Sequence, residues 1–88
     1  MASFDTVYEL FWDDIYITFM EDDTIPEVVD PDNPMGFEIR YYPIDKIWHC
    51  TADFLCRNQK DTYVSMTREY TSDMVGYMEY LNCLKDNG

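Results

Sequence analysis

The sequence predicts an α+β domain with the element order α-β-β-β-α: a three-stranded antiparallel sheet with an N-terminal and a C-terminal helix on one face. Two observations lead to this prediction. Apolar residues recur every three or four positions near both ends of the chain, and every second position between residues 37 and 70. The 88 residues, 47% hydrophobic and 17% aromatic, suffice for one small folded domain that spans residues 1–88.

A first helix is predicted over residues 3–20, because the apolar residues there share one helical face. They are Phe4, Val7, Tyr8, Phe11, Ile15 and Phe19. Thr6 and Glu9 have the spacing of a capping box, which is typical of a helix N-terminus. Residues 15–19 are β-branched and aromatic, so a helix that ends near Asp14 and is followed by a strand stays open as an alternative.

Residues 21–36 are predicted to form an acidic connecting loop. This segment contains three prolines, six acidic residues and one glycine, and proline disfavours helix at the residue before it. We expect the prolines to keep the loop extended, as a stiff acidic arm that loses little entropy on binding.

Three strands follow. The first covers residues 37–42 and ends at Pro43, the second covers residues 48–56, and the third covers residues 64–70 after a polar turn at residues 57–61. In the second strand, alternation places the apolar residues on one face. They are Trp48, Cys50, Ala52, Phe54 and Cys56.

The last helix is predicted to begin after Thr71 or Ser72, either of which can cap it, with Asp73 in the first turn. It ends before Asn87 and Gly88. One side of this helix is apolar and is expected to cover the sheet. Its residues are Met74, Tyr77, Met78, Leu81 and Leu84.

The net charge of −12 belongs almost entirely to the first half of the chain. Residues 1–39 contain eleven acidic residues and no Lys or Arg, whereas from Arg40 onward seven acidic residues meet six basic ones. A balance this negative excludes direct binding to nucleic-acid phosphates or to an anionic membrane. Any macromolecular partner is expected to be basic.

The cysteine count and the N-terminus predict a soluble cytoplasmic protein. Three cysteines are an odd number for a disulfide framework, and no basic and apolar leader opens the chain. No apolar run approaches the roughly 20 residues that span a bilayer. We expect folding to need neither a disulfide nor a metal.

Catalytic and cofactor motifs are missing from the sequence. His49 is the one histidine, and strand alternation places it on the face opposite Cys50 and Cys56, which disfavours both a nucleophilic pair and a zinc site. The acidic segment at residues 30–41 has Met35 where a calcium loop needs glycine. We therefore expect a protein that is not an enzyme and that binds no cofactor or metal.

The acidic residues of the first half form the candidate site. On a helix, Asp5, Glu9 and Asp13 share the face opposite the apolar stripe, at about 6 Å per step, which resembles the spacing of successive phosphates. Trp12 and Tyr16 lie beside them and can contact Arg or Lys side chains. An ordinary solvated face is the plain alternative. The predicted partner-binding residues are Asp5, Glu9, Trp12, Asp13, Asp14, Tyr16, Glu21, Asp22, Asp23, Glu27, Asp30 and Asp32.

These features favour a non-enzymatic inhibitor that occupies the basic nucleic-acid-binding surface of a nuclease or defence complex. Small acidic anti-CRISPR and anti-restriction proteins of phages and mobile elements act as DNA mimics of this kind. The alternative is an immunity protein, an antitoxin or an adaptor subunit that binds a basic protein through acidic and aromatic residues. A small enzyme or metal-binding domain is the third hypothesis, and the exposed aromatics leave a homodimer open.

Overall fold

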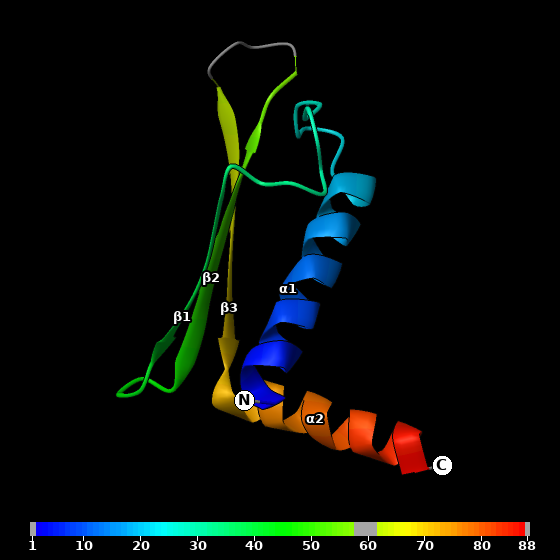
Figure 1. Ribbon diagram of the computed structural model, residues 1–88, viewed down its shortest axis with the longest axis vertical. Coiled ribbons are helices and arrows are strands. Elements are labelled where there is room, and N and C mark those ends of the chain that lie inside the picture. The colour runs from blue at the N-terminus through cyan, green and yellow to red at the C-terminus, as the bar shows by residue number, and fades with distance from the viewer. Residues whose placement is uncertain (1, 58–61, 88) are drawn as a thin grey trace.

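The computed structural model describes residues 2–57 and 62–87, and within them it contains two helices and three strands in the predicted order (Figure 1). The α+β class and the order α-β-β-β-α are therefore confirmed. The elements are α1 (Ala2–Glu21), β1 (Gly36–Tyr42), β2 (Ile47–Leu55), β3 (Tyr63–Thr71) and α2 (Ser72–Asn87).

The three strands form one antiparallel sheet in the order β1-β2-β3. In this register the central residue Cys50 lies opposite Ile39 on one side and Arg68 on the other. The turn between β1 and β2 needs a left-handed backbone at Lys46, where φ is 55°. Most of the predicted turn between β2 and β3 falls on residues 58–61, outside the described residues.

Helix α1 runs without interruption to Glu21, so the alternative of a strand over residues 15–19 is wrong. Ile15 lies one helical turn beyond Phe11, and both are fully buried, so packing against the sheet overrides the β propensity of this segment. The capping box predicted at Thr6 is also wrong. The helix begins at Ala2, and Thr6 lies buried within its second turn.

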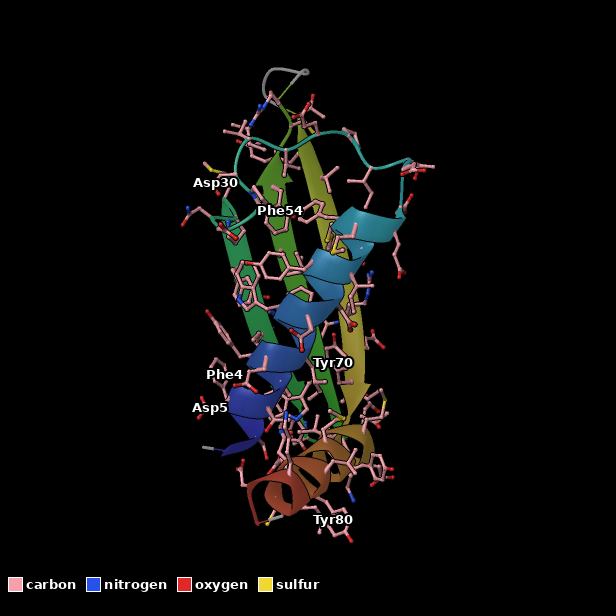
Figure 2. The ribbon with its side chains drawn as sticks, turned by 90° about the vertical axis from the view of Figure 1, so that its right-hand side faces the viewer. Phe4, Asp5, Asp30, Phe54, Tyr70 and Tyr80 are labelled. Atoms are coloured by element: carbon pink, nitrogen blue, oxygen red, sulfur yellow. The ribbon has the colours of Figure 1, made fainter. Side chains whose placement is uncertain are left out.

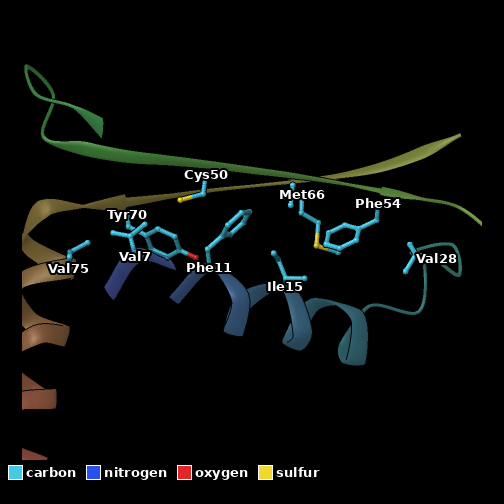
Figure 3. Close-up of a cluster of buried hydrophobic side chains, with 10 residues drawn as sticks. Val7, Phe11, Ile15, Val28, Cys50, Phe54, Met66, Tyr70 and Val75 are labelled. Atoms are coloured by element: carbon cyan, nitrogen blue, oxygen red, sulfur yellow. The ribbon is translucent and has the colours of Figure 1, made fainter. Parts of the chain in front are cut away.

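A single layer of side chains between α1 and the inner face of the sheet forms the core (Figure 3). Alternation along β2 buries Cys50, Ala52 and Phe54, as the sequence predicted. The buried hydrophobic residues are Val7, Phe11, Ile15, Val28, Cys50, Ala52, Phe54, Cys56, Met66, Tyr70 and Val75.

Helix α2 lies on the same side of the sheet as α1 but crosses beneath the end of the sheet and the start of α1 (Figure 1). Ser3 donates a hydrogen bond of 2.9 Å to Glu79 and so joins the two helices. Thr71 accepts a hydrogen bond of 3.1 Å from the backbone of Met74, which confirms the predicted cap. Because β3 passes directly into α2, the cap fixes the direction in which the helix leaves the sheet.

The expectation that the apolar side of α2 covers the sheet is wrong. Within the described part of α2, Val75 is the buried residue, and it belongs to the core. Of the five side chains predicted to face inward, Met78 is half-buried and the other four are exposed. Tyr80 on the same helix lies away from the sheet (Figure 2). The exposed residues are Met74, Tyr77, Tyr80, Leu81 and Leu84.

A polar link crosses the core layer between Tyr70 on β3 and Asp14 on α1, where the tyrosine hydroxyl donates to the carboxylate. Burial and this hydrogen bond raise the pKa of Tyr70 above its ordinary value. Burial also raises the pKa of the Cys50 thiol from 9.0 to about 11. Both groups therefore stay protonated in the folded protein at pH values where the unfolded chain begins to ionise.

We expect stability to fall as pH rises through the window from 9 to about 11. The folded state binds the Cys50 proton more tightly than the unfolded state does, so its contribution is complete below pH 9 and disappears toward pH 11. Urea unfolding at pH 8, 9.5 and 11 measures the loss. Cys50→Ala should reduce this pH dependence and leave the part above pH 10 that Tyr70 contributes, and an unchanged slope in that variant would contradict the assignment.

Candidate protein-binding site

Four aromatic residues form a row along one flank of α1. Phe4, Tyr8, Trp12 and Tyr16 follow one another every four residues, so each ring lies one turn beyond the last. The ring centroids of neighbours are 6.4, 6.4 and 5.6 Å apart. We call these four residues the aromatic row.

Phe37 on β1 fixes the aromatic row to the sheet. Its ring stacks on Trp12 at 5.4 Å with an interplanar angle of 13°. It also contacts the rings of Tyr8 at 5.7 Å and of the buried Phe11 at 5.5 Å. The middle of the aromatic row therefore packs against the edge strand β1.

Trp12 is packed into the domain and does not project freely from its surface. It is partly exposed, but it packs against the core and its Nε1 is buried without a hydrogen-bond partner. Phe37 covers one face of the Trp12 ring. Trp48 is also partly exposed and packed against the core, so both tryptophans contribute to the packing of the domain.

A hollow of about 430 Å³ lies beside the aromatic row, between α1 and the loop at residues 30–33. The hydroxyl of Tyr16 donates a hydrogen bond of 2.7 Å to Asp32 and so ties the helix to the loop. We call this feature the acidic hollow. Its lining residues are Tyr8, Glu9, Trp12, Asp13, Tyr16 and Asp32.

Three carboxylates and three aromatic rings line the acidic hollow, and no basic side chain is among the lining residues. Glu9 and Asp13 are one helical turn apart on α1, and Asp32 faces them from the loop. The hydrogen bond from the Tyr16 hydroxyl to the Asp32 carboxylate raises the pKa of Tyr16 above its ordinary value. The surface is negative and has donor groups as well as acceptors.

The loop is folded onto the end of β2 instead of projecting as the extended arm that the prolines suggested. The backbone N–H groups of Val29 and Met35 donate to Leu55 and Asp53 at 2.8 and 2.7 Å. Val28 is buried and forms an isolated β-bridge with Cys56. These contacts hold the loop against the end of β2.

Asp30 and Asp22 stabilise the loop itself. Asp30 accepts hydrogen bonds from the backbone of Asp32 at 3.0 Å and from the side chain of Asn33 at 2.6 Å. Asp22 accepts from the backbone and hydroxyl of Thr24. These hydrogen bonds lower the pKa of both carboxyl groups, which keeps them charged.

The structure separates the predicted site residues into groups with different surroundings. Five of the twelve line the acidic hollow: Glu9, Trp12, Asp13, Tyr16 and Asp32. Asp5 is exposed one turn before Glu9 and extends the same face, and Glu21 and Asp23 are exposed where α1 ends.

Two predicted residues are engaged elsewhere. Asp14 accepts the Tyr70 hydroxyl on the side of α1 that faces the sheet, and Glu27 forms an ion pair of 3.5 Å with Arg57. Tyr8 and Phe37 were missed as site residues. The four-residue spacing of the aromatics in the sequence was the signal for Tyr8, whereas nothing in the sequence indicates that Phe37 lies against α1.

Three observations concern metal binding, catalysis at His49 and membrane insertion. They contain no cluster of three or more His, Cys, Asp or Glu side chains arranged for a metal ion. His49 lies on the outer sheet face, 3.3 Å from Glu69, while Cys50 is fully buried on the inner face. Neither helix, over the part of the chain that is described, has the length and hydropathy to cross a bilayer.

Comparisons of the chain with protein-family models, with curated proteins and with solved structures found no match.

Proposed function

We propose that this protein is a non-enzymatic inhibitor that binds, through the acidic hollow and the adjoining face of α1, the basic nucleic-acid-binding surface of a nuclease or defence complex. One observation supports the proposal above all others. Three carboxylates and three aromatic rings meet at one preformed hollow, within a segment of eleven acidic residues that has no Lys or Arg.

The acidic hollow suits an arginine side chain. A guanidinium is planar and donates in a fork to a carboxylate, while its flat face stacks on an aromatic ring. Glu9, Asp13 and Asp32 supply the acceptors, and Tyr8 and Tyr16, 45% and 42% exposed, supply ring faces at the rim.

The acidic face of α1 matches what a nucleic-acid-binding surface recognises. Asp5, Glu9 and Asp13 follow one another at about 6 Å along the helix axis, close to the distance between successive phosphates. Arginines placed to contact a phosphate backbone would therefore meet carboxylates at a comparable repeat. An inhibitor of this kind, encoded by a phage or mobile element, would act in the cytoplasm of the host cell.

An immunity protein, antitoxin or adaptor is the second candidate function. It is favoured by the aromatic half of the hollow, since Tyr and Trp are the residues that most often dominate the energetics of protein interfaces. Here the apolar contacts would provide most of the affinity, and the charges would mainly accelerate association.

Competition with DNA tests the proposal directly. The protein is immobilised and used to capture partners from lysate treated with nuclease, and duplex DNA is then added to the captured complex. We expect the immobilised protein to capture a nucleic-acid enzyme, and we expect the added DNA to displace this enzyme from it. Capture of a small basic toxin that DNA leaves in place would contradict the inhibitor proposal and favour an immunity protein.

We expect the affinity of the complex to fall steeply with salt. A surface that replaces several phosphates loses its ion pairs as ionic strength rises, so the dissociation constant should increase by at least about 100-fold between 50 and 300 mM salt. Calorimetry at four salt concentrations measures this slope. A dissociation constant that stays nearly constant, with salt changing the association rate alone, would point to the second candidate function.

A further inference from the structure

Helix α2 has two different faces, and the rest of the chain covers one of them. Val75 enters the core, and Glu79, one turn later, accepts the hydrogen bond from Ser3. The opposite face is apolar and exposed: Met74, Tyr77, Leu81 and Leu84 are 50%, 62%, 37% and 52% exposed. We call these four residues the α2 seam.

The spacing within the α2 seam is that of a helix-pairing surface. Its members are three, four and three residues apart, which corresponds to the a and d positions of two successive heptads. A helix that only covers a sheet commonly shows a broader apolar stripe, whereas a strict a and d stripe is typical of helices that pair with another helix. The exposed Tyr80 borders the seam and widens it.

Charge favours a second copy of this chain over a basic partner at the α2 seam. The seam side chains are uncharged, so a basic protein gains no ion pairs by covering them. Helix α2 also carries three acidic residues and one basic residue, whereas α1 carries five acidic residues and no basic one. Two copies that carry −12 each therefore repel one another less at this end than along α1.

The apolar area at α2 is large enough for a weak dimer. A large aromatic side chain buries roughly 150–250 Å², and the patch contains two tyrosines, each about 60% exposed. With the smaller contributions of Met74, Leu81 and Leu84, it offers on the order of 500 Å² per copy. Two copies would bury about 1,000 Å² in total, where specific but weak interfaces begin.

We infer that the protein forms a twofold homodimer in which the α2 helices of two copies pair antiparallel along their seams. Antiparallel pairing brings a positions opposite d positions, so that Met74 packs against Leu84 of the second copy and Tyr77 against its Leu81. It also aligns the two helix dipoles favourably. The acidic hollow lies along the middle of α1, so pairing at α2 leaves one hollow open on each copy (Figure 1).

Sedimentation equilibrium from about 1 to 500 µM tests the inference, because an interface of this size dissociates at the lower concentrations. We expect the average mass to rise with concentration from 10.6 kDa toward twice that value. Tyr77→Glu and Leu84→Glu should each remain monomeric throughout. Wild-type protein that stays monomeric at the highest concentration would overturn the inference.

Ile44→Glu is the matched control. Ile44 is 94% exposed in the turn between β1 and β2, so this variant makes the same chemical change away from α2 and should still dimerise. Circular dichroism establishes that the variants are folded. Leu84 lies in the last turn of α2, so Leu84→Glu still tests the interface if Tyr77→Glu unfolds the protein. Dimers that persist in folded seam variants, or that Ile44→Glu also dissociates, would contradict an α2 interface.

Cross-linking tests the orientation. In a Cys83→Ser background, Met74→Cys combined with Leu84→Cys brings the introduced thiols together across an antiparallel pair, so oxidation should give a covalent dimer. Tyr77→Cys alone in the same background would cross-link efficiently in a parallel pair instead, and that result would overturn the antiparallel arrangement.

Discussion

Replacing Phe11 with alanine is expected to lower the free energy of unfolding by about 3–5 kcal/mol. Phe11 is fully buried at the centre of the layer between α1 and the sheet, and its ring contacts Phe37 at 5.5 Å. The total stability of a small domain is about 5–15 kcal/mol, so this single change removes a large part of it. Urea unfolding followed by circular dichroism measures the difference.

Phe4→Ala is the matched control, since it deletes the same side chain from the same helix. Phe4 is 43% exposed and stacks on Tyr8 at 6.4 Å, so the expected loss is under about 1 kcal/mol. Similar losses in the two variants would mean that α1 is not packed on the sheet as described.

The combined substitution Asp13→Lys and Asp32→Lys is expected to weaken binding to a basic partner by at least about 100-fold. These two carboxylates line the acidic hollow from the helix and from the loop, so the change places two ammonium groups where the proposed arginine would lie. Like charges at an interface cost several kcal/mol. Calorimetry or biolayer interferometry against the captured partner measures the effect.

Asp45→Lys combined with Asp86→Lys changes the net charge equally and serves as the control. Both residues are exposed and lie outside the hollow, in the turn after β1 and near the end of α2. We expect this variant to bind within about tenfold of the wild type. Equal losses in the two variants would show that net charge alone, and not the acidic hollow, drives binding.

The order of the elements and the faces of β2 were predictable from the sequence, because both follow from local periodicity. Cys50, Ala52 and Phe54 alternate with half-exposed neighbours and are buried as expected. The extent of α1 does not follow from local periodicity alone, since Ile15 is β-branched and its helical conformation is stabilised by packing against the sheet. Local propensity therefore does not predict that the helix continues through Ile15.

The facing of α2 could not be predicted from its own pattern. An apolar stripe on a helix indicates that the stripe packs against another apolar surface. The pattern is the same whether that surface belongs to the sheet of the same chain or to another chain. The candidate site was likewise predictable only in part. Charge counting found Glu9, Asp13 and Asp32, whereas the contact between Asp14 and Tyr70 joins residues 56 positions apart and leaves no local trace in the sequence.

The contacts that join the two ends of the chain also bear on when it can fold. Ser3 and Glu79 are 76 positions apart, and Asp14 and Tyr70 are 56 apart, so part of the packing of α1 depends on elements that are synthesised well after it. During translation, α1 leaves the ribosome before the strands do and has only part of the sheet available to it until β3 follows. The closing of such long loops favours slow folding after synthesis, with the apolar side of α1 exposed to chaperones in the interval.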